Sequence, residues 1–214
     1  PTAALTTIGM PVGHWNPVGR LLLITVHGDF QDTPWDHVKG FANYLEQQFK
    51  FAETLPPRIG KQLVVRLHGF YRHLNWSEDK RWRNRSPDTV LDIGYTPINS
   101  LMRQSRLIVH TYNYTGILEA LALNITVLSF WDTKHWRLRP SALPYFDRLK
   151  QAGIFHENAE SAVTKVTEVW DDVAKWWNRS EVQEARHCFC ERFARLPERP
   201  IRILRETLMG VKSE

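Results

Sequence analysis

Apolar residues in this chain gather in short runs, and the stretches between the runs carry apolar positions at helical spacing. The runs predict six strands: Leu21–Val26, Gln62–Leu67, Thr89–Ile93, Leu107–His110, Thr126–Phe130 and Ile154–His156. The stretches between them predict helices from Asp32 or Thr33 to about Phe51, then Ile98–Gln104, Gly116–Leu123 and Pro140–Ala152. Strands that alternate with helices are typical of a parallel sheet covered on both faces. We therefore predict an α/β fold: a doubly wound, mostly parallel, Rossmann-like sheet of about six strands, with helices on both faces and a helical C-terminal tail.

Proline, glycine and charge divide the chain further. Residues 1–19, rich in Pro and Gly, predict an irregular lead-in or interdomain linker, and residues 20–178 predict the Rossmann-like domain. Residues 179–214 predict helices that pack on this domain or on a missing N-terminal domain. The segment 77–87 is highly charged and has no apolar period, so we expect a long exposed loop there. Because the chain begins with Pro1 and not with Met, we expect it to be part of a longer polypeptide.

The stretch 106–139 organises the rest of the chain. It contains a buried strand, a polar turn, a helix, a second buried strand and a polar, aromatic loop. This is a βαβ unit, whose two strands are parallel. We expect the chemistry to lie in the two loops that leave the carboxyl ends of those strands.

Composition narrows the class of protein. An apolar fraction of 43%, with nine Trp and ten Phe, predicts an ordered core. Cys188 and Cys190, two residues apart in a predicted helix, support neither a disulfide framework nor a zinc site, which favours a reducing cytoplasm. The sequence contains no secretory signal and no apolar run long enough to span a bilayer. A net charge of +5 fits an anionic partner and an ordinary solvated surface about equally well.

The turn 110–116 is the strongest candidate binding site. It places His110, Thr111, Asn113, Tyr114, Thr115 and Gly116 at the start of a predicted helix. A helix N-terminus offers free N–H groups and a partial positive charge, which suit a phosphate or carboxylate. Alternatively, Thr115 or Asn113 merely caps the helix. Glu119, one turn later on a largely apolar helix, could accept both hydroxyls of a ribose.

Two more loops carry candidate residues at the carboxyl ends of strands. The loop 131–139 supplies Trp131, Asp132, Trp136 and Arg139, types suited to stacking on a base or sugar and to neutralising phosphate, although a surface loop with basic residues is the simpler alternative. The exit of the second strand supplies Arg66 and His68, and a buried Arg is costly unless it meets an anion. We identify no catalytic group; His27 and Asp29 are candidates for an acid/base pair, although a loop His is more often incidental. The sequence has no HxxxH, HExxH, GxGxxG, P-loop or GxSxG motif, so we expect no metal and no cofactor.

Several phrases together resemble a known family: RLIVHTYNYTGILEALALNITVLSFWD, WRLRPSALPYFDRL, GIFHENAESAV and the tail WW…VQEARHCFCERFA. They resemble the C-terminal half of a bacterial surface-carbohydrate biosynthesis transferase family. That family is similar to GT-B glycosyltransferases and allied to enzymes that use CMP-activated acidic sugars such as 3-deoxy-octulosonic or nonulosonic acids. The resemblance covers about residues 20–195.

The resemblance implies roles for individual residues. It places the donor phosphate at Asn113–Gly116 and the ribose or base near Glu119. In GT-B enzymes the N-terminal domain mostly binds the acceptor and often supplies the general base. This chain departs from the pattern in two ways: it lacks the ExxxxxxxE pair, because Glu119 has no acidic partner at the right distance, and it has His68-Gly69-Phe70 where a Pro-containing turn is expected.

We therefore expect the donor-binding half of a glycosyltransferase, inactive alone, which moves a sugar from a nucleotide sugar to a surface-polysaccharide acceptor. The expected partners are the nucleotide sugar donor, the carbohydrate acceptor and the missing N-terminal domain. The expected location is the cytoplasm, with at most peripheral association with the inner face of a membrane. Two alternatives are a non-catalytic nucleotide- or anion-binding module in polysaccharide assembly and a nucleotide-sugar epimerase. The basic, aromatic segment 71–85 allows nucleic-acid binding, but nothing requires it, so we expect none.

Overall fold

The computed structural model describes residue 13 and residues 16–26, 37–74, 77–134 and 136–210. In this part of the chain six strands form one all-parallel sheet in the order β3-β2-β1-β4-β5-β6. The strands are β1 Arg20–Ile24, β2 Leu63–Arg66, β3 Val90–Asp92, β4 Ser105–His110, β5 Val127–Phe130 and β6 Phe155–His156. This confirms the predicted fold class and all six predicted strands.

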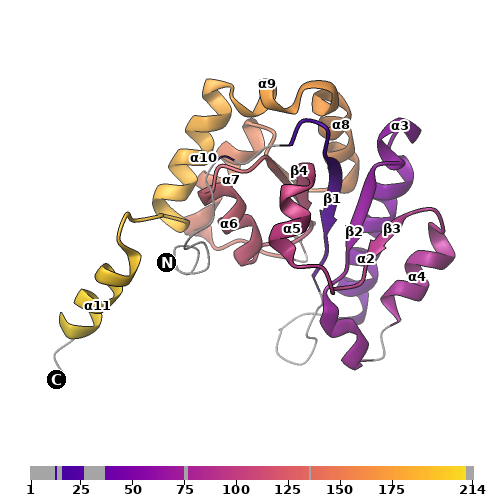
Figure 1. Ribbon diagram of the computed structural model, residues 1–214, viewed down its shortest axis with the longest axis horizontal. Helices are drawn as coiled ribbons and strands as arrows, with labels where there is room; N and C mark the ends of the chain where they lie inside the picture. The colour runs from indigo at the N-terminus through magenta and orange to yellow at the C-terminus, as the bar shows by residue number, and fades with distance from the viewer. Residues whose placement is uncertain (1–12, 14–15, 27–36, 75–76, 135, 211–214) are drawn as a thin grey trace.

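Helices surround the sheet (Figure 1). Those of the first half are α2 His37–Thr54, α3 Pro57–Gly60, α4 Glu78–Arg85, α5 Ile98–Arg103 and α6 Thr115–Ala122. Those of the second half are α7 Leu143–Gln151, α8 Ala159–Val169, α9 Val173–Trp177, α10 Ser180–Phe193 and α11 Pro200–Gly210. Three short 3-10 helices complete the described elements: η1 Gly69–Leu74, η2 Pro140–Ala142 and η3 Trp170–Asp172.

The central strands β1 and β4 build the core. β1 pairs with β2 on one side and with β4 on the other, and Leu21, Leu22 and Leu23 are almost completely buried. α2 packs against α8, while α10 packs against α6 and α7. Because right-handed crossovers leave β1 and β4 in opposite directions along the sheet, these two groups of helices cover opposite faces. Burial on both faces explains why the strands are continuous apolar runs instead of alternating ones.

The two ends of the chain differ in how closely they join this domain. Most of the predicted lead-in lies outside the described residues, but Gly19 lies so close to the backbone of residues 104–106 that a Cβ would fall 2.5 Å from the Arg106 nitrogen. α10 packs on the domain through buried Val182 and Phe189. Residues 201–210 of α11 are all exposed, and the helix extends away from the body of the molecule (Figure 1). The predicted C-terminal helices therefore include one that is part of the domain and one that is not packed on it.

The prediction of an exposed loop at 77–87 is wrong. These residues form α4, whose inner face buries Trp82 against Phe49 with ring centroids 4.7 Å apart. At its end, Arg85 donates hydrogen bonds of 2.6 to 2.7 Å to the carboxylates of Glu46 and Glu53 on α2. A helix with a single large apolar residue shows no hydrophobic periodicity in its sequence. The contacts with α2 explain why α4 forms.

Replacing Trp82 with Ala should lower the free energy of unfolding by about 3 to 5 kcal/mol, because it removes the anchor of α4 and leaves a cavity against Phe49. Urea denaturation of the 214-residue chain would measure this. The matched control is Asn84→Ala, an exposed position on the same helix, which should change stability by no more than about 0.5 kcal/mol. Equal effects of the two substitutions would mean that Trp82 does not anchor the helix.

Glu78 should give the protein a pH-dependent stability. The side chain is 2% exposed, and burial raises the pKa of its carboxyl from 4.5 to about 7. The folded state therefore keeps a proton that the unfolded state releases near pH 4.5, and the stability that this contributes is lost as pH rises toward 7. Buried His110 and half-buried His156 act in the opposite sense, because their lowered pKa values, about 3 and about 4, make stability fall as pH drops below 6.5.

The contribution of Glu78 can be isolated as a difference between wild type and Glu78→Gln. Relative to wild type, the variant should become more stable as pH rises from 4.5 to about 7, measured by urea denaturation at several pH values. The matched control is Glu184→Gln, which makes the same chemical change at an exposed position of α10. A difference between wild type and Glu78→Gln that stays constant with pH would contradict the raised pKa.

Candidate functional site

The direction of the chain through the sheet reverses between β1 and β4. From β1 the chain moves outward to β2 and β3, and it then returns to β4 on the other side of β1. Such a point opens a crevice at the carboxyl ends of the two strands, where ligands of open α/β sheets bind. The described part of this crevice is the turn after β4, residues 111–114, and the start of α6. The loop that follows β1, with His27 and Asp29, lies outside the described residues.

A chain of hydrogen bonds joins the exits of β1 and β4. The Val26 N–H donates to the Tyr44 hydroxyl over 2.8 Å, and the Tyr44 and Thr111 hydroxyl oxygens are 2.6 Å apart. Thr111 donates its own proton to the Ile24 carbonyl over 3.0 Å, so Tyr44 must be the donor to Thr111. Burial raises the pKa of Tyr44, which keeps the hydroxyl protonated for this role. Thr111 was predicted to bind a ligand, but its hydroxyl forms hydrogen bonds that join the ends of the two strands.

The N-terminus of α6, which begins four residues after Thr111, has no side-chain cap. Its N-cap residue is Tyr114, with extended backbone (φ −122°, ψ −164°), and the side chain of Tyr114 makes no capping hydrogen bond to the described residues. Neither of the two alternative caps, Asn113 and Thr115, occupies the N-cap position. The first-turn amides of α6 can therefore serve an external anion.

Gly116, in the first turn of α6, packs closely against the imidazole ring of His110. A Cβ on Gly116 would lie 2.7 Å from His110 Cε1, so only glycine lets the first turn of α6 approach the imidazole this closely. His110 is 1% exposed, and burial lowers its pKa to about 3, which leaves the ring uncharged. Neither ring nitrogen has a hydrogen-bond partner among the described residues. His110 is therefore a neutral, buried support and not a cation that neutralises phosphate.

Glu119 lies one turn into α6 and is half-buried. Among the described residues no hydrogen bond or ion pair occupies its carboxylate, which distinguishes it from the paired Glu46 and Glu53 of α2. Its charge also acts on Tyr112: burial first, and then Glu119, raise the pKa of that phenol to about 12. A half-buried carboxylate of this kind can accept hydrogen bonds from vicinal hydroxyls.

Three aromatic rings stand beside the helix start. The Trp136 ring centroid lies 5.3 Å from that of Tyr114 and 6.5 Å from that of Tyr112, and the two tyrosine rings are 5.5 Å apart. Tyr114 is 52% exposed, so its ring remains accessible. The structure thus brings together the two regions that the sequence analysis treated as separate sites, the turn 110–116 and the loop 131–139.

Other predicted residues of the loop 131–139 have different roles. Trp131 is 3% exposed and packs in the core against Phe146 and Phe155, so it does not offer a face for stacking. Asp132 shapes the loop instead, because its carboxylate accepts hydrogen bonds from the Lys134 amide over 2.8 Å and from the Asn43 side chain over 3.3 Å. Arg139 is exposed at the start of η2, and no described residue forms an ion pair with it.

Arg66 also differs from the prediction. The anion that it meets is Asp92 at the end of the neighbouring strand β3, and both side chains are largely buried. Burial disfavours the charge of Asp92, but hydrogen bonds from Thr96, the Gly94 amide and Arg66 outweigh it and lower the pKa of the carboxyl. Part of His68 is exposed to solvent, and the burial of the rest, followed by the charge of Arg66, lowers its pKa. The Arg66 charge is therefore already compensated within the protein.

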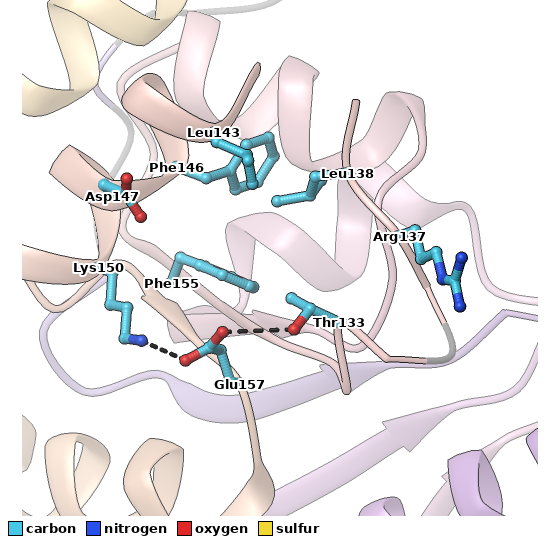
Figure 2. Close-up of a pocket in the computed structure, with 9 residues that line it drawn as sticks. All are labelled: Thr133, Arg137, Leu138, Leu143, Phe146, Asp147, Lys150, Phe155 and Glu157. Atoms are coloured by element: carbon cyan, nitrogen blue, oxygen red, sulfur yellow. Dashed lines mark hydrogen bonds and ion pairs between the residues drawn. The ribbon is translucent and has the colours of Figure 1, made fainter. Parts of the chain in front are cut away.

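A hollow of about 260 Å³ is lined in part by the loop 131–139 (Figure 2). Figure 2 shows Glu157 joined to Lys150 by an ion pair and to Thr133 by a hydrogen bond of 3.3 Å. The hollow is lined by Thr133, Arg137, Leu138, Leu143, Phe146, Asp147, Lys150, Phe155 and Glu157. The sequence analysis missed it because its apolar residues look like ordinary core. Only the position of Thr133 and Glu157 after the ends of β5 and β6 could have indicated it.

Among the described residues, no cluster of three or more His, Cys, Asp or Glu side chains could hold a metal ion. None of the described helices combines the length and the apolar character that crossing a bilayer requires.

Comparison with known proteins places the chain in a family. The model of the LIC12162 family transferases matches residues 4–208. The chain belongs to this family of transferases. No curated protein matches at a significant level.

Several solved structures resemble this chain, and three of them are described. Anabaena Alr3699/HepE in complex with UDP-glucose is 13% identical with a TM-score of 0.51, over 91% of this chain and 50% of that one. The UDP-GlcNAc 2-epimerase from Neisseria meningitidis bound to UDP-GlcNAc is 19% identical (TM-score 0.48), over 89% of this chain and 45% of that one. The spinosyn rhamnosyltransferase SpnG complexed with spinosyn aglycone is 15% identical (TM-score 0.47), over 90% and 47% respectively. The first supports the Rossmann-like fold, and the chain spans about half the length of these proteins.

Replacing Tyr44 with Phe should lower the free energy of unfolding by about 1 to 3 kcal/mol, because it leaves the Val26 N–H and one side of the Thr111 hydroxyl without their partner. Urea denaturation would show the loss. Tyr114→Phe is the matched control, since that ring is exposed, and it should cost no more than about 0.5 kcal/mol. A Tyr44→Phe variant as stable as wild type would show that the hydroxyl does not hold the two strand ends together.

Proposed function

We propose that this transferase-family chain is the donor-binding half of a glycosyltransferase of the GT-B type. The observation that carries the proposal is the uncapped N-terminus of α6 at the reversal point of the sheet, with Glu119 one turn later. A nucleotide sugar presents a phosphate and a ribose about one helical turn apart, which matches the amides of the first turn and this carboxylate. The UDP-glucose complex of Alr3699/HepE, a protein with this fold, supports a nucleotide sugar as the ligand.

In the proposed binding mode the phosphate accepts hydrogen bonds from the amides of Thr115 and Gly116, and Glu119 accepts from the ribose hydroxyls. Tyr114 and Trp136 flank the donor, and His110 supports the turn from below as a neutral group. When the sugar is transferred, negative charge grows on the leaving phosphate. The helix N-terminus and the exposed Arg139 stabilise that charge, whereas Arg66 is already paired with Asp92.

The remaining parts of the proposed reaction belong to a longer protein. The acceptor, a surface polysaccharide, and the general base would be held by an N-terminal domain across the crevice. We further propose a CMP-linked acidic sugar as donor, on the basis of the resemblance in 106–132 and 136–149. This finer proposal predicts that CMP binds more tightly than UDP.

Replacing Glu119 with Ala should weaken nucleotide binding at least about tenfold, a loss of about 1.4 kcal/mol, because the ribose hydroxyls lose their acceptor. Calorimetric titration of CMP and UDP into the chain would measure it. Glu184→Ala, on the surface of α10, is the matched control and should bind as wild type does. Unchanged affinity in Glu119→Ala would remove the ribose assignment.

The nucleotide and the reaction are tested separately. Tighter binding of UDP than of CMP would overturn the CMP assignment while leaving the site in place. Release of nucleotide from nucleotide sugars, assayed with the polypeptide that contains both halves and a carbohydrate acceptor, separates transfer from a non-catalytic binding role. Binding of nucleotide without any release would favour the non-catalytic module.

A further inference from the structure

Helix α4 presents one face to the protein and a different one to solvent. Glu78 and Trp82, four residues apart, are buried on the inner face, and Arg85 is tied to Glu46 and Glu53 of α2. These contacts fix the rotation of the helix about its axis. The residues on the opposite side must therefore point away from the domain.

The outward side is basic. Lys80 and Arg83, one turn apart, are both exposed, as are Arg81 on the flank of the helix and Arg72 in the preceding η1. We refer to Arg72, Lys80, Arg81 and Arg83 as the α4 cationic face. Of the two acidic residues in α4, Asp79 is half-buried and Glu78 is enclosed, with a pKa raised by burial to about 7. The positive charge of the face is therefore only partly compensated by its own helix.

An exposed aromatic ring extends this face. The Arg72 guanidinium lies 4.2 Å from the centre of the Tyr95 ring, and Tyr95 is 76% exposed in the turn after β3. A tyrosine beside cations suits the boundary between polar headgroups and hydrocarbon, where its ring and its hydroxyl each find a matching environment. Arg72 and Tyr95 follow the carboxyl ends of β2 and β3, so these two residues lie toward the same edge of the sheet as the candidate site.

We propose that the α4 cationic face docks on a membrane surface that contains anionic lipid headgroups. The face belongs to a helix at the outer edge of the molecule, beside the edge strand β3 (Figure 1), where a broad planar surface can approach it. Clustered Lys and Arg side chains are attracted to such a surface, and the attraction acts within about a Debye length. Nucleic acid is less well matched, because single strands are bound in grooves that offer several stacking rings, whereas this face offers Tyr95. The docking is independent of the proposed glycosyl transfer.

The test is co-flotation of the chain with vesicles of phosphatidylcholine alone and of phosphatidylcholine mixed with phosphatidylglycerol. Wild type should float with the anionic vesicles only, and salt should release it. The affinity of the Lys80→Glu/Arg83→Glu variant for anionic vesicles should be lower than that of wild type by roughly tenfold or more. The affinity of Lys80→Ala/Arg83→Ala should lie between those of wild type and the Glu variant. Nucleotide affinity should stay at the wild-type value in both variants.

The matched control is Arg20→Glu/Lys61→Glu, which makes the same change in net charge at exposed positions next to the amino ends of β1 and β2. It should float as wild type does. The proposal is overturned if wild type ignores anionic vesicles, or if the control loses as much binding as the α4 variant. It is also overturned if a single-stranded oligonucleotide displaces the chain from vesicles and its own binding depends on Lys80 and Arg83, because the face would then belong to a nucleic acid. Far-ultraviolet circular dichroism verifies that each variant is folded.

Discussion

Hydrogen bonds through the hydroxyls of Tyr44 and Thr111 hold together the carboxyl ends of β1 and β4, where the order of strands in the sheet reverses direction. A parallel sheet pairs its strands through the backbone, but that pairing ends where the strands end, and the exits of β1 and β4 would otherwise be free to separate. Tyr44 accepts from the strand β1 side and donates to the β4 side, and Thr111 returns the chain to Ile24. Because α6 begins only four residues after Thr111, the position of its N-terminus depends on this junction.

Charge around the crevice is arranged by burial as much as by side-chain type. A histidine side chain is commonly a cation at moderately low pH, but His110 stays neutral because its ring is buried against Gly116. Arg66 keeps its charge but shares it with Asp92. Neither side chain is therefore available to an anion, and the favourable potential comes from the backbone amides of α6, with exposed Arg139 as the additional cation in the proposed binding mode.

Helix α4, at the edge of the molecule, forms although its own sequence has almost no hydrophobic pattern that predicts a helix. In α4, Trp82 is the one large apolar residue, and all the other residues except Asn84 are charged. Its stability derives from Phe49, Glu46 and Glu53 on α2, and the two hydrogen-bonded glutamates lie 39 and 32 positions before Arg85. The same contacts fix which cations point outward, so the helix and its surface charge have one cause.

The sequence by itself determined the α/β class, six strands, and the turn 110–116 as the start of a helix, because buried parallel strands and Gly- or Pro-bounded helices leave local patterns. It also identified Glu119 and Trp136, which share one region of the structure with that turn. Only the tertiary structure decided that the Thr111 hydroxyl joins the ends of β1 and β4 and that Trp131 lies in the hydrophobic core. It likewise decided that Arg66 pairs with Asp92 and that residues 78–85 are helical. Each of these depends on a partner distant in sequence, and periodicity records which residues are buried, not what they are buried against.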